Sequence, residues 1–169
     1  MGRFYASVVS ILATALAVML IGAAPVVAAA PPDHGSSTGP FAADNVTGIC
    51  PFGFDWTGTL SIRWTVVTNH DGTAVENDHY VQQDTFTNPA NGTVLSGDPY
   101  TGNYHATYDA SGALVSWYEN GGIESINLPD GSKIWVAGRD NVLDPIGPLT
   151  PAHGHSGDLT AFCNALATP

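Results

Sequence analysis

Residues 58–68 read Gly58-Thr59-Leu60-Ser61-Ile62-Arg63-Trp64-Thr65-Val66-Val67-Thr68. Its apolar residues 60, 62, 64 and 66 alternate with 61, 63, 65 and 67, which places two sets of side chains on two faces. Period-two alternation with many β-branched residues is typical of a β-strand that packs one face against a core. The stretch therefore predicts a strand in a mainly β protein.

Similar runs follow this stretch, and short turn sequences separate them. Asn69-His70-Asp71-Gly72 is the first of these turns, and Asn88-Pro89-Ala90-Asn91-Gly92 is another. Connections this short join antiparallel neighbours, because a parallel crossover needs a longer connection. We expect an antiparallel up-and-down barrel, or a sandwich, of about seven or eight strands. The expected strands are 58–68, 73–87, 93–95, 101–108, 113–119, 123–128, 133–137 and 141–143, with a turn at 120–122.

The last segment has a different period. Leu159, Phe162, Cys163 and Leu166 follow the i, i+3, i+4, i+7 spacing of an amphipathic helix. We expect a helix over 158–166, capped by Ser156, with its apolar stripe against the β body.

Cys50 and Cys163 are the two cysteines of the chain. Residues 1–29 resemble a secretory signal peptide, with Arg3 near the start, a charge-free apolar run and a small-residue end. An exported chain meets an oxidising compartment, where an even number of cysteines favours a disulfide. We therefore expect a secreted protein with a Cys50–Cys163 disulfide that fastens the terminal helix to the chain before the first strand.

The composition bounds the domain organisation. Removal of the signal leaves about 140 residues, enough for a single domain with a core. We expect a flexible tail at 30–45, rich in Pro, Gly and Ser, and one domain at 46–169. Three Lys and Arg against fifteen Asp and Glu then give a formal charge of −12. This charge argues against nucleic acid and anionic membranes as partners, and we expect no stable membrane anchor after cleavage.

Several short motifs carry a resemblance. They are a cysteine before the first strand, TNPANG at 87–92, YDASG at 108–112 and FCNAL at 162–166, behind an N-terminal signal. Together they resemble a group of small secreted actinobacterial proteins of unknown function. The resemblance covers 50–166. Its motifs are turns and packing residues, so it implies a fold and assigns no catalytic residue.

His153-Gly154-His155 is the one local pattern with metal-ligand spacing. Two histidines at i, i+2 can chelate a divalent ion when a third ligand, such as Asp158, His34 or Asp144, lies nearby. The alternative is a polar loop before the last helix. We expect no cofactor otherwise.

The strand-borne polar and aromatic residues give the remaining candidates. His79, His105, Trp117, Tyr118 and Glu119 are candidates to line a ligand site inside the barrel. Trp117 and Tyr118 are adjacent, so they must point to opposite faces. The alternative for the histidines and carboxylates is a solvent-facing position, and for the aromatic residues it is core packing.

No catalytic motif such as a GxSxG elbow or an HExxH helix occurs. We therefore expect a non-enzymatic secreted domain that binds a small apolar ligand or a protein partner. The alternative is a small barrel enzyme of the cyclase or isomerase type. It would use acid–base residues such as His79, His105 or Glu119 in the lumen.

Overall fold

The computed structural model describes residues 31–144 and 149–169. The predicted signal segment lies outside these residues, so its cleavage stays a prediction. The described elements, in chain order, are β1 (Asp33–Val46), β2 (Phe54–Thr68), β3 (Ala74–Asn88), β4 (Thr93–Ser96), β5 (Tyr100–Tyr108), β6 (Leu114–Asn127), β7 (Lys133–Asn141), β8 (His153–His155) and the helix α2 (Leu159–Ala167).

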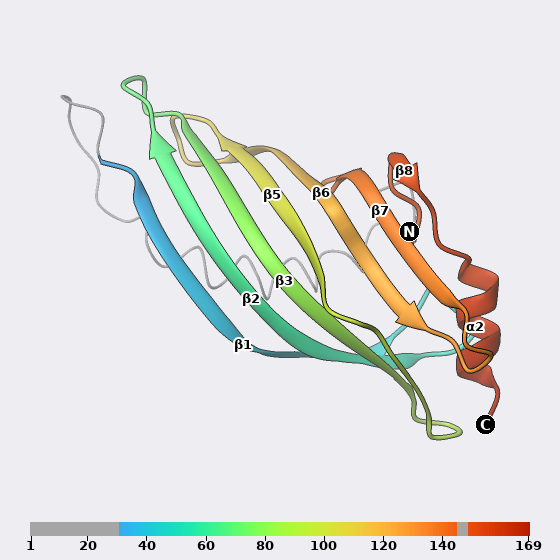
Figure 1. Cartoon of the computed structure of the whole chain (residues 1–169). Helices are drawn as coiled ribbons and strands as arrows, with labels where there is room; N and C mark the ends of the chain where they lie inside the picture. Colours follow the sequence, from blue (N-terminus) through green and yellow to red (C-terminus); the bar gives the residue numbers. More distant parts are fainter. Residues whose placement is uncertain (1–30, 145–148) are drawn as a thin grey trace.

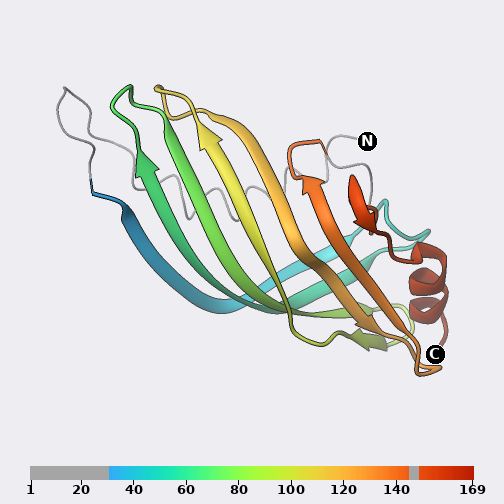
Figure 2. The ribbon, with the colours of Figure 1, turned by 45° about the horizontal axis from the view of Figure 1, so that its top comes forward.

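The eight strands form one antiparallel sheet, which confirms the predicted fold class. Its order is β1-β2-β3-β5-β6-β7-β8, and β4 pairs with the far end of β3 (Figure 1). The sheet does not close, because β1 and β8 form its two edges within the described residues. Figure 2 shows that the sheet is strongly bent, so that β1 and β2 turn toward the end where α2 lies.

The register assigns every side chain to one of two faces. Directly opposite residues of neighbouring strands point to the same face, and successive residues point to opposite faces. Trp56 faces Phe86 in this register, and Phe86 contacts Phe162 of α2. We call the face that carries Phe86 and packs against α2 the core face, and the opposite face the outer face.

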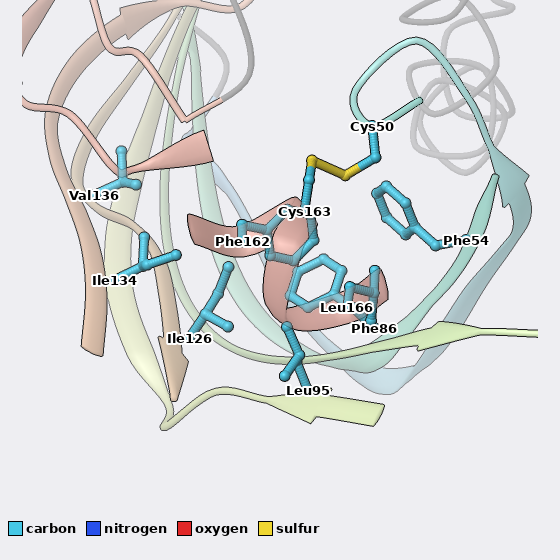
Figure 3. Close-up of a cluster of buried hydrophobic side chains, with 10 residues drawn as sticks. All are labelled: Cys50, Phe54, Phe86, Leu95, Ile126, Ile134, Val136, Phe162, Cys163 and Leu166. Carbon is cyan, nitrogen blue, oxygen red and sulfur yellow. A yellow bond between two sulfur atoms is a disulfide. The ribbon is translucent and has the colours of Figure 1, made fainter. Parts of the chain in front are cut away.

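The apolar core lies between α2 and the core face. Phe162, Cys163 and Leu166 of α2 point into a cluster with residues of β2, β3, β4, β6 and β7 (Figure 3). The rings of Phe54 and Phe162 meet edge-on, 5.6 Å apart, which suits the charge distribution of aromatic rings. The other apolar members are Phe86, Leu95, Ile126, Ile134 and Val136.

The Cys50–Cys163 disulfide is confirmed. It joins the segment before β2 to α2, with the two Cα atoms 5.5 Å apart. The helix is confirmed as well, but its N-cap is Asp158, whose side chain accepts from the Ala161 backbone N–H. No helix in residues 31–144 or 149–169 is long and apolar enough to cross a membrane.

Two glycine-containing segments differ from expectation. Most of the predicted flexible tail forms β1, which pairs with β2 from Asp33 opposite Val66 to Val46 opposite Phe54. Glycine is needed in this strand because the indole of Trp64 lies over Gly35, where a Cβ would be 2.0 Å from the ring. Pairing with the regular strand β2 thus outweighs the low strand propensity of this segment.

The predicted turn at 120–122 is also wrong, because β6 continues through these residues. Its Gly122 carbonyl accepts a hydrogen bond from Tyr80, and a bulge between Gly122 and Glu124 absorbs the irregularity. β7 extends to Asn141, so the short strand expected at 141–143 does not form.

Candidate functional site

Most strand-borne carboxylates lie on one face of the sheet, and the two strand-borne arginines lie on the other. Seven carboxylates share the core face, namely Asp33 on β1, Glu76, Asp78 and Asp84 on β3, Glu119 and Glu124 on β6, and Asp140 on β7. Arg63 and Arg139 lie on the outer face, opposite His79 and Asn120 respectively. Although the protein is acidic as a whole, this part of the outer face is therefore locally cationic.

One row of outer-face side chains crosses six strands. Each member is the direct partner of the next, from β2 through β3, β5, β6 and β7 to β8. We call this set the outer-face row: Arg63, His79, Asn103, Asn120, Arg139 and His153. The row is continuous because each of the five pairs of neighbouring strands is in regular register at these residues.

The centre of the row contains a repeated Asn-x-His pattern. Asn77-Asp78-His79 on β3 runs antiparallel to Asn103-Tyr104-His105 on β5, so each asparagine faces the other strand's histidine. The His79 Nδ1 lies 3.1 Å from the Asn103 Oδ1, and the His105 Nδ1 lies 2.8 Å from the Asn77 Oδ1. With both amide oxygens used as acceptors, the two amide NH₂ groups remain available as donors. We call these four residues the Asn–His quartet.

A pocket of about 640 Å³ lies over the quartet. Arg63, Asn120, Arg139 and Tyr118 stand around it, and the guanidinium of Arg139 lies 4.2 Å from the centre of the Tyr118 ring. This arrangement is a cation–π contact. A neighbouring pocket of about 240 Å³ shares Tyr118 and Arg139 and extends the polar surface to His153.

Within residues 31–144 and 149–169, neither cation of this pocket forms a salt bridge. The one salt bridge within the described residues joins Lys133 to Asp98, outside the pocket. The other two Lys and Arg side chains of the described residues, Arg63 and Arg139, both line the pocket. Both are exposed at the surface. Two guanidinium groups left unpaired in a protein with fifteen Asp and Glu are therefore available for an external anion.

The core face behind the pocket holds a network of carboxylates and tyrosines. The Tyr80 hydroxyl donates to the carboxylate of Glu119 and to the Gly122 carbonyl oxygen, the latter at 2.7 Å. Tyr108 donates to Glu76 at 2.6 Å. These bonds connect β3 to β5 and to β6.

Asp84 is the most heavily bonded member of this network. It is fully buried and accepts from Tyr100 at 2.6 Å, from the Trp56 indole at 2.9 Å and from Gln82 at 3.0 Å. Glu124 of β6 lies near Asp84, and the charge of Asp84 helps to raise the pKa of Glu124. This pair of residues brings β3 and β6 together close to residues 97–99, which separate β4 from β5.

Burial governs the titration of these carboxyl groups. Desolvation raises the pKa of Glu119 to about 7, against the opposing hydrogen bonds from Tyr80 and Tyr104. Desolvation and the neighbouring Glu76 carboxylate raise the pKa of Asp78 to about 7. Burial and the charge of Asp84 raise the pKa of Glu124 well above its ordinary value. The core face therefore holds carboxylic acids that are protonated more readily than exposed ones.

The structure divides the predicted ligand-lining residues between the two faces. His79, His105 and Tyr118 lie on the outer face and line the pocket, whereas Trp117 and Glu119 lie on the core face. The sheet thus separates the histidines from Glu119. An acid–base pair made of one of these histidines and Glu119 is not assembled in one cavity.

The predicted metal ligands His153 and His155 both lie on the edge strand β8 and are exposed. Within residues 31–144 and 149–169, no group of three or more His, Cys, Asp or Glu side chains is placed to hold a metal ion. A metal at this pair stays a prediction from the i, i+2 spacing.

Sequence reasoning missed five residues of the site: Arg63, Asn77, Asn103, Asn120 and Arg139. Two signals in the sequence point to them. One is the repeated Asn-x-His pattern at 77–79 and 103–105, and the other is the scarcity of Lys and Arg in the chain. Neither signal predicts the register that brings these residues together.

The chain was compared with protein-family models, with curated proteins and with solved structures, and none of the three comparisons finds a match.

Proposed function

We propose that this protein is a secreted binding domain that holds an anionic, hydroxyl-rich ligand in the outer-face pocket. The observation that carries the proposal is the pair of unpaired arginines, Arg63 and Arg139, in one polar pocket of an otherwise acidic chain. A guanidinium forms bidentate hydrogen bonds with a carboxylate or phosphate and keeps its charge at any physiological pH.

The rest of the pocket supports a ligand with hydroxyl groups. The Asn–His quartet and Asn120 offer amide and imidazole groups. These groups can donate hydrogen bonds to the hydroxyls of a sugar and accept hydrogen bonds from them. Few apolar side chains line the pocket, which favours a polar ligand over the apolar one expected from the aromatic content. The separation of the histidines from Glu119 favours binding over acid–base catalysis.

Export is part of the same proposal. It is supported by the signal-like segment at 1–29 and by a disulfide that is compatible with an extracellular protein. Expression in an exporting host, followed by N-terminal sequencing of the protein in the medium, tests it. A protein retained in the cells with Met1 or Gly2 at its start would contradict export.

Isothermal titration tests the binding function. Polygalacturonate is the probe, and its fully methyl-esterified form is the matched ligand without charge. We expect binding of the acid form, at least about tenfold weaker binding of the ester, and a similar loss in the Arg63→Gln/Arg139→Gln variant. Equal binding of both forms, or none by either, would contradict the proposal.

A further inference from the structure

The two arginines of the pocket are far apart, which limits the ligands that can use both. Arg63 is on β2 and Arg139 is on β7, with His79, Asn103 and Asn120 between them in the row. Four strand-to-strand steps of about 4.8 Å separate their backbones by about 19 Å. A small anion is therefore much shorter than the distance between the two backbones, and this spacing favours a longer ligand that extends from one arginine to the other.

The outer-face groups between the arginines are hydrogen-bonding side chains, namely the amides and imidazoles of the quartet and Asn120. Asp78 also borders the pocket, but the register directs its side chain to the core face beside Trp64 and Tyr104. A ligand that crosses the pocket therefore meets a cation at each end and hydrogen-bonding groups in the middle. Its own chemistry should match this order, with separated anionic groups and hydroxyls between them.

The far end of the row extends the same surface. Arg139 leans over Tyr118, and the smaller pocket continues past both side chains to His153 on the edge strand. The polar surface is thus open at the β8 edge, so a ligand can continue beyond the row.

We infer that the ligand is a linear acidic polysaccharide that lies across the strands, with uronate carboxylates at Arg63 and Arg139 and sugar hydroxyls over the Asn–His quartet. This inference rests on the proposed function and adds the length and direction of the ligand. The arginine spacing favours an extended ligand, and the amides and imidazoles between the arginines favour hydroxyls between its charges.

A nucleic acid is the other extended anion, and the observations favour it less. Binding to nucleic acid usually relies on many Lys and Arg contacts to closely spaced phosphates. Here two arginines of the described residues line the pocket, and the chain has a large excess of carboxylates. Widely spaced carboxylates suit two arginines better. Physiological salt largely screens charges that are more than about 8 Å apart. Carboxylates at distant sites on the protein therefore repel an anionic ligand in the pocket only weakly.

Isothermal titration with galacturonate oligomers tests the inference. Hexagalacturonate is longer than the about 19 Å between the two strands, and trigalacturonate is shorter. We expect hexagalacturonate to bind at least about tenfold more tightly than trigalacturonate, because only the longer chain reaches both arginines.

Three single variants sharpen this experiment. Arg63→Gln and Arg139→Gln should each weaken hexagalacturonate binding about tenfold, down to the level of the trimer. Lys133→Gln is the matched control, because it removes the same charge outside the pocket, and it should change the affinity less than about twofold. Thermal melting of each variant confirms that it is folded.

The outcomes separate the two proposals. Equal affinities for trimer and hexamer, with only one arginine variant affected, would overturn the extended binding mode and leave the anionic pocket standing. No binding of any galacturonate would overturn the proposed function itself. Tighter binding of single-stranded DNA than of hexagalacturonate, lost in the same arginine variants, would overturn the assignment to a polysaccharide.

Discussion

The hydroxyl of Tyr80 on β3 donates a hydrogen bond to the carboxylate of Glu119 on β6, across the intervening strand β5. The contact is possible because Gly102 of β5 lies beneath the tyrosine ring, where a Cβ would be 2.3 Å from the Tyr80 hydroxyl oxygen. Tyr80 has no exposed surface. Tyr80, which packs over Gly102, therefore joins β3, β5 and β6 on the core face.

The first prediction concerns this glycine. Gly102→Ala should lower the free energy of unfolding by about 1–3 kcal/mol, because the new methyl group displaces Tyr80 from Glu119 and from the Gly122 carbonyl. Urea denaturation measures the change. Gly39→Ala is the matched control on the core face of β1, where a Cβ meets no atom within 4 Å, and it should stay within about 0.5 kcal/mol of the native protein. Equal effects of the two variants would contradict the role of Tyr80.

The second prediction concerns pH. The folded pKa of Glu119 is about 7, above the ordinary value of 4.5, so the folded state binds more protons than the unfolded state between these two values. The stabilising contribution is complete below about pH 4.5 and is lost as the pH rises through about 7. We expect the free energy of unfolding to fall by on the order of 1 kcal/mol or more over this range.

Glu119→Gln is the variant that isolates this contribution. The amide oxygen of glutamine can still accept from Tyr80, but the side chain no longer titrates. Urea denaturation between pH 4.5 and 7.5 should show a shallower pH dependence for the variant. Asp78, with a pKa of about 7 as well, should maintain part of the slope. A slope that is unchanged in Glu119→Gln would contradict a raised pKa at this residue.

The third prediction concerns the disulfide. Reduction, or the Cys50→Ser/Cys163→Ser variant, should lower the free energy of unfolding by about 2–5 kcal/mol, because the bond closes a long loop in the unfolded chain. Calorimetry should show a lower melting temperature, and the far-ultraviolet circular dichroism of the sheet should remain at low temperature. A melting temperature unaffected by reduction would mean that the bond has no stabilising role.

The fourth prediction concerns the packing of α2. Leu166 has no exposed surface, and Leu166→Ala should cost about 2–5 kcal/mol of unfolding free energy because it leaves a cavity under the helix. Leu143→Ala removes the same atoms from a side chain that is 48% exposed, and it should cost less than about 1 kcal/mol. Similar losses in the two variants would show that α2 is not part of the stable core.

The sequence predicted those parts of the fold whose local pattern agrees with their surroundings. The alternation of Leu60, Ile62, Trp64 and Val66 predicted most of β2, and the spacing of Leu159, Phe162 and Leu166 predicted α2. It failed at β1 and at the middle of β6, where glycines occur in strands. Those glycines are explained by side chains from other strands, namely Trp64 over Gly35 and Trp135 beside Gly122, and no local pattern contains that information.

The candidate site could be predicted only in part, because strand register decides which residues complete it. His79, His105 and Tyr118 were named from their residue types, but the arginines that complete the pocket were not. Arg63 lies within residues 58–68, where the alternation places it only on the face opposite to Leu60 and Ile62. Its connection to Arg139 requires the register of four successive strand pairs, which a single sequence does not contain.

The proposed ligand site lies on the outer face of the sheet and not on the core face. The most direct test is a nuclear magnetic resonance titration of the assigned, exported protein with hexagalacturonate. We predict that the signals of Arg63, Asn103 and Arg139 shift together and saturate, while those of Tyr80 and Glu119 stay in place. Shifts confined to Tyr80, Glu119 and their core-face neighbours, with the outer-face row unchanged, would contradict the account.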